Sequence, residues 1–385
     1  MTDTKTESKD KLRSQALDLL RFPLAVVVLT VHIFNTQHQG LSFSGQTVNF
    51  NDYPIFIELN HIIDAFLRSQ SVPIYYFISG YVFFIGLQEW NKEKYKNKLK
   101  NRTKSLLIPY IIWNSFFIIQ LILTIYTPLS KYLAQASEFN PTFENFLSCF
   151  WMYDGCLAGV SETMYAPSKI YPINVPLWFI RDLMVMVLSA PVLYWLIKRT
   201  KFIIVAVLGI LWGCKQVGLG FLPFYFPYAA AFFFSWGAYM MINKKDMIAE
   251  FGKYGKTSLV LYITLGVLYI IAAHLYPDAL KAIKGANIIV GLVFAYNLAV
   301  YLINKNICKS NKFLSASSFF IYIGHALICG KVLKLLYIGI KPTNDFTVIF
   351  VFVFAVILSV LLLVGTFKLM QKFTPKLLSI VAGRK

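Results

Sequence analysis

An arginine and a histidine lie eleven residues apart in one apolar segment, LDLLRFPLAVVVLTVHIF, as Arg21 and His32. Ionisable side chains are costly inside a bilayer, so their presence in a membrane-spanning segment indicates a functional site. Eleven residues of α-helix turn through about 1100°, which places both side chains on one face, about 16 Å apart along the axis. This spacing suits a long molecule that enters from one side of a membrane and reacts near the other.

Further polar side chains are predicted at about the depth of His32, counting about 1.5 Å of helix rise per residue. They come from three other apolar segments and are Ser79, Arg181, Asp182 and His325. Trp178 shares a helix face with Arg181 and Asp182, at positions i, i+3 and i+4. Buried groups of this kind need mutual partners or a water-filled cavity. The sequence therefore predicts a polar cavity that opens to the outside.

Each of these residues also has a purely structural interpretation. Arg181 and Asp182 can pair with each other instead of contacting a substrate. Ser79-Gly80 fits a close helix-packing point better than a nucleophile, because no base lies beside it in the sequence. A single intramembrane histidine such as His325 can serve as a structural hydrogen-bonding group.

The composition predicts an all-α membrane protein with several spanning helices. The chain has 385 residues, of which 57% are hydrophobic and 14% charged, whereas soluble domains have about 25% charged residues. We expect a bundle of about ten helices, with interfacial helices in two long external loops at 37–71 and 128–175. The predicted spans are 17–36, 72–88, 105–127, 176–197, 201–215, 223–243, 257–275, 284–304, 314–337 and 346–370. Residues 17–371 form the predicted transmembrane domain, between tails at 1–16 and 372–385.

The basic residues predict the orientation of these helices. With ten spans, 26 of the 37 Lys and Arg residues fall on the side of the two termini and nine on the opposite side. The positive-inside rule then puts both termini in the cytoplasm, in a multi-pass protein of the cell (inner) membrane. Topology accounts for most of the net charge of +19, so no nucleic-acid partner is expected. Arg102 and Lys104, at the start of the third span, are candidates to hold a phosphate. The five cysteines lack metal-ligand spacing, and we expect no metal.

Five short motifs occur in order along the chain: LDLLRFPLAVVVLTVHIF, VPIYYFISGYVFF, RTKSLLIPYIIW, PLWFIRDLMVM and SSFFIYIGHALI. Together they resemble the acyltransferase-3 family of integral membrane acyltransferases, whose first helix carries an arginine, ten residues and then a histidine. The resemblance runs from residue 17 to about residue 330. The second motif has Tyr75 and Tyr76 where phenylalanine is more usual in the family.

The resemblance implies transfer of an acyl group, often acetyl, from cytoplasmic acyl-CoA to a hydroxyl of an extracytoplasmic glycan or related acceptor. It implies that Arg21 binds the donor and that His32 is the catalytic residue. Arginine pairs well with phosphate, and neutral imidazole is a suitable general base at physiological pH. Arg181 and Asp182 are further catalytic candidates, because Arg181 or a nearby tyrosine could stabilise an oxyanion. An acyl-histidine intermediate is a variant of this mechanism.

The remaining candidates are substrate contacts, and several functions stay open at this stage. Trp178, Ser79 and His325 are the expected substrate-binding residues, in contact with a glycan or small-molecule acceptor beside membrane lipid. A transporter or flippase for glycans or lipid-linked sugars is the alternative function, and a structural or sensory protein is a third. The acceptor itself can be a surface polysaccharide, lipid-linked sugar, peptidoglycan, antibiotic or small metabolite.

Overall fold

The computed structural model describes residues 2–34, 41–43, 46–48, 50–126, 142–151, 171–220, 222 and 225–383. Helices dominate these residues, which confirms the predicted class. The helices of the first half are α1 (Thr2–Ile33), α2 (Pro54–Ile63), α3 (Ser71–Phe83), α4 (Lys92–Arg102), α5 (Ile108–Tyr126), α6 (Phe143–Ser148), α7 (Trp178–Leu188) and α8 (Ala190–Thr200). Those of the second half are α9 (Phe202–Gln216), α10 (Tyr228–Ile242), α11 (Met247–Gly252), α12 (Gly255–Leu275), α13 (Leu280–Asn304), α14 (Lys312–Ile340), α15 (Asp345–Phe373) and α16 (Pro375–Val381).

Short elements complete the described chain. The strands β1 (Leu41–Phe43) and β2 (Gln46–Val48) form an antiparallel pair with Leu41 opposite Val48. Three 3₁₀ turns are η1 (Phe50–Asp52), η5 (Val175–Leu177) and η6 (Pro277–Ala279). Two π-helical turns are η2 (Asp64–Arg68) and η3 (Thr103–Leu107). Of the second predicted external loop, residues 142–151 and 171–175 are described. They include α6, in a loop where an interfacial helix is expected.

Six described helices are long and apolar enough to cross a membrane, or seven if a bent pair counts as one span. Each predicted span contains a helix, but α3, α9 and α10 have only 13, 15 and 15 residues. At about 1.5 Å per residue, each covers less than the roughly 30 Å of a bilayer core. The fold class is therefore confirmed, and the count of ten spans is not.

The fourth predicted span is broken between α7 and α8. The two helices meet at an angle of 64°, and Pro191 lies in the first turn of α8. A proline ring removes a backbone donor and clashes with the preceding turn. At the same place the hydroxyl of Ser189 donates to the carbonyl of Val185 at 2.8 Å. The break ends α7 soon after the polar residues of the PLWFIRDLMVM motif.

The chain divides into two compact units, each described here by itself. Unit 1 comprises residues 1–28, 61–100 and 185–318, and unit 2 comprises 29–60, 101–184 and 319–385. The division passes through α1 and α2, which are each one continuous helix. Arg21 and His32 therefore keep the spacing of one continuous helix, although the division falls between them.

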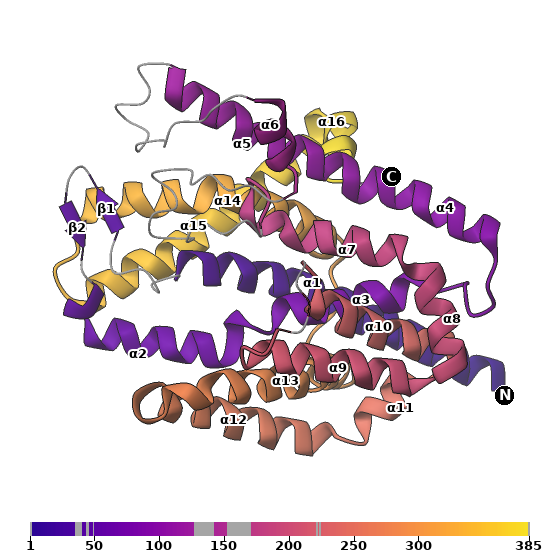
Figure 1. The fold of residues 1–385 in the computed structure, drawn as a ribbon. Coiled ribbons are helices and arrows are strands. Elements are labelled where there is room, and N and C mark those ends of the chain that lie inside the picture. Colours follow the sequence, from indigo (N-terminus) through magenta and orange to yellow (C-terminus); the bar gives the residue numbers. More distant parts are fainter. Residues whose placement is uncertain are drawn as a thin grey trace. The chain divides into compact units, whose positions relative to one another are not determined.

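In unit 1 the helices α3 and α10 lie side by side at very close range (Figure 1). A Cβ atom added at Gly80 would overlap the carbonyl oxygen of Phe234, and one added at Gly237 would overlap that of Phe77. Small residues allow helix backbones to approach in this way. The interpretation of Gly80 as a point of close helix packing is thereby confirmed.

In unit 2 aromatic rings join the end of α1 to α2 and α15. Phe56 packs on Phe352 with ring centroids 4.6 Å apart, and Phe34 and Phe50 complete the cluster. The backbone N–H of Phe56 donates to Asp345 Oδ1 at 2.9 Å. These contacts hold the last turn of α1, which carries His32, within unit 2.

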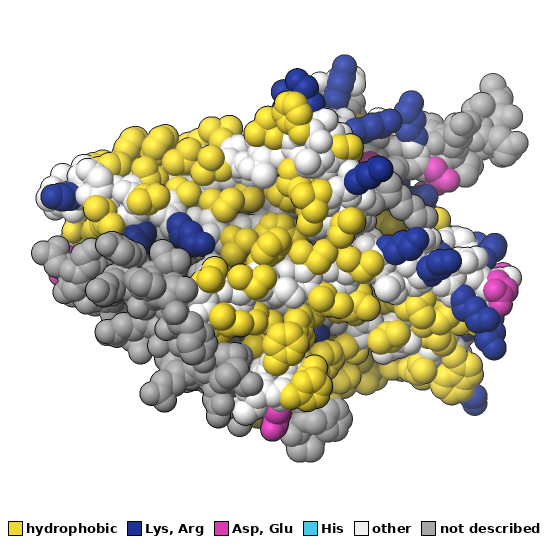
Figure 2. Space-filling view, turned by 90° about the horizontal axis from the view of Figure 1, so that it is seen from above, with side chains coloured by type: hydrophobic (Ala, Val, Ile, Leu, Met, Phe, Trp, Pro, Cys, Tyr) yellow, Lys and Arg dark blue, Asp and Glu magenta, His cyan; other side chains and the backbone are white. Residues whose placement is uncertain are grey.

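Large apolar side chains are exposed along many of the described helices, among them Ile203 on α9, Val260 on α12 and Leu361 on α15. Hydrophobic side chains cover much of the face shown in Figure 2. Apolar surface of this extent is rare on water-soluble proteins and is the surface that lipid covers. The helix lengths and this surface together identify a multi-pass membrane protein.

Candidate active site

Arg21 lies in the middle of α1, in the part that belongs to unit 1. Its Nη1 donates to Asp18 Oδ1 at 2.8 Å, and both side chains are 36% exposed. The hydroxyl of Tyr75 donates to the Arg21 carbonyl at 2.6 Å, so α3 holds this turn of α1. Ser315 approaches Asp18 from α14 at 3.4 Å. A guanidinium has five N–H donors, so an anion can share this group with Asp18.

His32 and His325 are brought together in unit 2. The centroids of their rings lie 4.8 Å apart, with an angle of 41° between the planes. His32 is half-buried near the end of α1, and His325 is 1% exposed in α14. The sequence predicted a similar depth for these two side chains, and the structure places their rings in contact.

The surroundings of His325 determine which ring nitrogen carries its proton. Its Nδ1 makes a short contact with the carbonyl of Tyr322. A carbonyl only accepts hydrogen bonds, so Nδ1 carries the hydrogen and the neutral ring keeps a lone pair on Nε2. Among the described residues, Nε2 is buried and has no hydrogen-bond partner. A buried acceptor therefore lies on the ring that packs against His32.

Tyr322 connects this histidine to the segment before α7. Its hydroxyl donates to the carbonyl of Pro176, and its ring packs on Phe179 with centroids 5.5 Å apart. The motifs around PLWF and FFIYIGH thus contact each other through Tyr322. Trp178 is half-buried and packs against Tyr171 at 6.5 Å.

Arg181 and Asp182 form a buried ion pair in unit 2. Nε and Nη2 of Arg181 donate to Asp182 Oδ1 at 3.0 and 2.9 Å. Nη1 donates to the carbonyl of Trp151 at 2.7 Å, and the guanidinium lies 5.4 Å from the centre of the Trp151 ring. All three guanidinium nitrogens therefore have protein partners. The pairing considered in the sequence analysis is confirmed, and Trp151 is a partner that the sequence did not reveal.

Two asparagines lie in the same part of unit 2. The side-chain oxygen of Asn114, on α5, accepts from the backbone N–H of Asn174 at 3.1 Å. Asn174 is fully buried, and neither atom of its side-chain amide has a partner among the described residues. Burying an unsatisfied amide costs about 1–3 kcal/mol. Asn174 is therefore a candidate binding residue that the sequence analysis missed.

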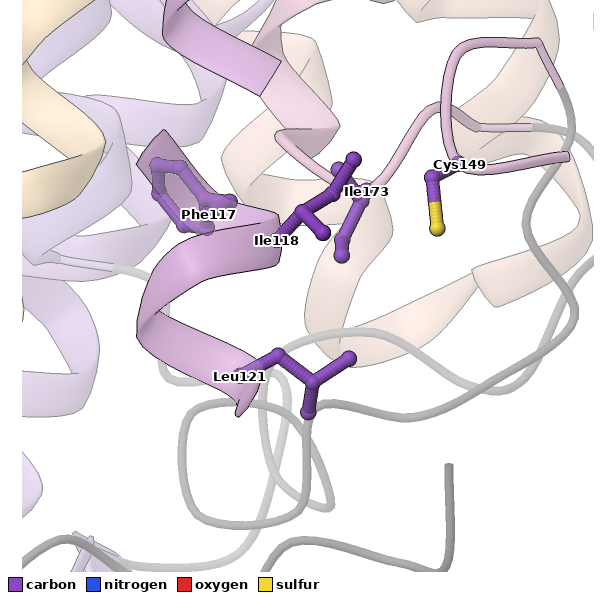
Figure 3. Close-up of a cluster of buried hydrophobic side chains, with 5 residues drawn as sticks. All are labelled: Phe117, Ile118, Leu121, Cys149 and Ile173. Carbon is purple, nitrogen blue, oxygen red and sulfur yellow. The ribbon is translucent and has the colours of Figure 1, made fainter. Parts of the chain in front are cut away.

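A small apolar cluster fixes the chain on either side of these polar groups. Phe117, Ile118 and Leu121 on α5 contact Cys149 and Ile173, as Figure 3 shows. The backbone N–H of Ile173 donates to the carbonyl of Cys149 at 2.8 Å. Burial raises the pKa of the Cys149 thiol to about 12. This cysteine serves as an apolar packing residue.

The remaining predicted residues lie in three places. Ser79 is half-buried on α3 in unit 1, next to the Gly80 packing contact. In unit 2, Arg102 ends α4 and Lys104 is exposed in the π-helical turn η3. Turns of this type occur often at functional sites.

Asp18 also escaped the sequence analysis. The signal for it is simple, because it precedes Arg21 by three residues and so lies on the same helix face. The partners Trp151 and Asn174 lie in segments without periodicity, and no local signal identifies them.

Comparison with known proteins gives one family and one relative. The acyltransferase-3 family model, described as an acyltransferase domain, matches residues 14–365. The succinoglycan biosynthesis protein ExoH of Rhizobium meliloti (strain 1021) is 24% identical over 387 residues, which cover 97% of this chain and 92% of that protein. No solved structure matches the chain at a significant level.

Proposed function

Because the chain belongs to the acyltransferase-3 family, we propose that it transfers an acetyl group from cytoplasmic acyl-CoA to a hydroxyl of an extracytoplasmic glycan. The family match and the apolar helices make it a membrane acyltransferase. The name of the ExoH relative refers to the biosynthesis of succinoglycan, and this supports a polysaccharide acceptor. The distribution of Lys and Arg supports cytoplasmic termini, with the donor entering from that side.

The observation that carries the proposal is the pair of imidazole rings, His32 and His325, 4.8 Å apart in unit 2. Acyl transfer to a hydroxyl needs a group that removes the hydroxyl proton as the oxygen attacks. His32 takes this role. The Nε2 lone pair of His325 accepts a hydrogen bond from a second hydroxyl of the glycan, which orients the reacting hydroxyl toward His32.

The reaction follows from these roles. His32 removes the hydroxyl proton while the oxygen forms a bond to the thioester carbonyl carbon. The tetrahedral intermediate then collapses, the carbon–sulfur bond breaks, and the CoA thiolate takes the proton back from the His32 imidazolium. The products are the acylated glycan and free CoA. The charge on the intermediate requires a hydrogen-bond donor, and two candidates are the buried amide of Asn174 and the hydroxyl of Tyr171. Burial raises the pKa of Tyr171; Arg181 opposes this and Asp182 adds to it. Tyr171 therefore keeps its proton at neutral pH.

Arg21 is proposed to bind a phosphate of the donor. It lies on the same helix as His32, about 16 Å nearer the proposed cytoplasmic end at 1.5 Å per residue. This distance suits the pantetheine arm of CoA, which is long, narrow and largely uncharged. Arg102 and Lys104 are proposed as further donor contacts, because both cations lie at the proposed cytoplasmic end of the third predicted span.

The test measures transfer of radiolabel from acetyl-CoA to the envelope polysaccharide in membranes that contain the full-length protein. His32→Ala and His325→Ala are compared with Ser115→Ala. Ser115 is a matched control on α5, because its hydroxyl donates to the carbonyl of Ile111 on the same helix, at an exposed position. General-base catalysis contributes about 10²–10⁴-fold, so we expect a loss of that size for His32→Ala and wild-type transfer for the control. Wild-type transfer by a correctly inserted His32→Ala protein would refute the base assignment.

The donor role of Arg21 is tested separately. Arg21→Ala should raise the apparent KM for acetyl-CoA while the KM for the acceptor stays near that of wild type. Mass spectrometry of the envelope glycans, with and without the protein, then gives the mass of the acyl group and the acceptor together. A defect confined to the acceptor would contradict the proposed donor site.

A further inference from the structure

One helix of unit 1, α8, has an exposed apolar face that ends in a cation. The buried residues of α8 recur at helical spacing and are Ala190, Leu193 and Ile197. On the opposite face Val192 and Trp195 are 60% and 56% exposed, and the exposed Arg199 follows one turn later. Tryptophan is enriched where a membrane meets water, and helices with separate apolar and cationic parts lie in that interface. The end of α8 therefore has the composition of a segment that lies among lipid headgroups.

The cations at the end of α8 differ in their partners. Lys198 Nζ lies 3.2 Å from Glu89 Oε1, so these two side chains form an ion pair. The guanidinium of Arg199 lies 5.5 Å from the centre of the Trp195 ring. Arg199 and Lys201 form no ion pair among the described residues. Two unbalanced positive charges therefore lie in the same turn, next to an exposed tryptophan.

Aromatic residues hold the start of α4 against α8. The backbone N–H of Trp90 donates to the hydroxyl of Tyr194 at 3.0 Å, and the two rings lie 5.2 Å apart. Tyr95, in the first turn of α4, packs on the other contact of Trp90 with ring centroids 5.2 Å apart. Its hydroxyl lies 3.4 Å from the carbonyl oxygen of Leu188, just before α8. The two segments therefore form one surface within unit 1.

The helix α4 adds a row of lysines beside α8. They are Lys92, Lys94, Lys96, Lys98 and Lys100. In residues 88–100 and 188–201, eight cations and two carboxylates leave a net charge of +6. The two carboxylates are already paired, Glu89 with Lys198 and Glu93 with Lys96. We call the eight cations of these two segments the α4–α8 basic surface.

We propose that the α4–α8 basic surface binds the headgroup of an anionic phospholipid, whose acyl chains lie along Val192 and Trp195. A guanidinium such as that of Arg199 pairs well with a phosphate. Clusters of about four to eight Lys and Arg residues next to a membrane-spanning helix bind anionic lipid. A soluble nucleotide would neutralise the cations but would leave the apolar face uncovered. A lipid covers both parts, and for this reason it is the favoured ligand.

The test reconstitutes the full-length protein in vesicles of zwitterionic phosphatidylcholine and anionic phosphatidylglycerol, with brominated chains on one of the two lipids. Bromine quenches tryptophan fluorescence only at contact, so quenching shows which lipid lies beside a tryptophan. The difference between the wild type and Trp195→Phe isolates the signal of Trp195. One cation near an anionic membrane surface strengthens binding about fivefold. We therefore expect phosphatidylglycerol to be preferred at Trp195 by about that factor or more.

Two double variants separate the contributions of the two helices. Arg199→Gln with Lys201→Gln should lower the preference to about one, because it removes the two unbalanced cations that follow Trp195. Lys94→Gln with Lys100→Gln should lower it severalfold, because it weakens the positive charge of α4. Lys305→Gln is the matched control, since Lys305 is an exposed lysine of the same unit at the end of α13. It should keep the wild-type preference.

Equal quenching of Trp195 by the two brominated lipids in the wild type would overturn the proposal. Wild-type preference in either double variant would also overturn it. Free CoA is added at constant ionic strength as a competitor, and the preference for phosphatidylglycerol should persist. If CoA abolishes it, the cations bind the phosphates of a nucleotide and not a lipid. These readouts do not depend on acyl transfer, so the proposal stands or fails separately from the proposed function.

Discussion

Replacing Arg181 by methionine tests whether the buried ion pair holds the fold or takes part in the reaction. Arg181 is 0% exposed, and its three nitrogens donate to Asp182 and to the carbonyl of Trp151. Methionine keeps most of the length of the side chain and removes the charge and all these bonds. The carboxylate of Asp182, 2% exposed, is then left buried without its cation.

The expected cost follows from that unpaired charge. Removing one partner of a buried ion pair costs about 3–5 kcal/mol, whereas replacing both partners by apolar residues of similar volume is often neutral or stabilising. We therefore expect Arg181→Met and Asp182→Leu to lose about 3–5 kcal/mol each. The double variant Arg181→Met with Asp182→Leu should cost less than either single change, which gives a coupling energy of about 3 kcal/mol or more.

The assay is equilibrium unfolding of the purified protein in mixed micelles, titrated with SDS and followed by tryptophan fluorescence. Arg199→Met is the matched control, because Arg199 is an exposed arginine whose guanidinium lies 5.5 Å from the centre of the Trp195 ring. Loss of an exposed contact of this kind costs about 0.5–1 kcal/mol. Acetyl transfer is measured on the same samples and divided by the folded fraction.

One result would refute this structural role. If Arg181→Met unfolds like the wild type but transfers acetyl a hundredfold more slowly, the guanidinium acts on the reacting atoms and not on the fold. A coupling energy near zero with two costly single variants would also refute it, since the two residues would then stabilise the protein independently.

Three further measurements test packing, reactivity and pH dependence. Gly237→Ala should lower the free energy of unfolding by about 1–3 kcal/mol, because the added methyl overlaps a backbone carbonyl of α3. Gly213→Ala is the control and should not destabilise the protein, because beyond the backbone of its own helix the new methyl meets no atom within 4 Å. Burial raises the pKa of the Cys149 thiol to about 12. At pH 7.5 this thiol should therefore react with maleimide far more slowly than the half-buried Cys214 and Cys308. Burial acts to raise the pKa of Asp246, but the hydrogen bond and charge of Lys9 and two backbone N–H groups lower it overall. The stabilisation that ionised Asp246 gives the folded protein is complete above the usual aspartate pKa of about 3.9. It is lost as the pH falls through the lower pKa that Asp246 has in the folded protein. Asp246→Asn should therefore reduce the drop in unfolding temperature at acidic pH.

Apolar periodicity and length were enough to predict where helices form. The apolar segment around Arg21 and His32 is one helix, and each of the other predicted spans contains at least one helix. The lengths were harder to predict, because breaks depend on local backbone effects such as Pro191 at the start of α8. The π-helical turn that contains Lys104 changes the helix register without any pattern of apolar residues to signal it.

The site was predictable where its residues share a helix. Arg181 and Asp182 are neighbours in sequence, and their pairing was one of two interpretations before the fold was known. The contact between His32 and His325 joins α1 to α14, so the sequence indicated only a similar depth. The tautomer of His325 depends on the carbonyl of Tyr322 on the same helix, a contact that follows from the side-chain conformation and not from the sequence.

The buried polar groups of unit 2 fall into two kinds, and the difference bears on function. The guanidinium of Arg181 has partners on every nitrogen, so it stabilises the fold and has little capacity left for a ligand. Nε2 of His325 and the amide of Asn174 are buried with no partner among the described residues, at a cost of about 1–3 kcal/mol each. A substrate that supplies hydrogen bonds to these groups recovers that cost on binding. For this reason His325 and Asn174 are better candidates for contact with the reacting groups than the more conspicuous ion pair.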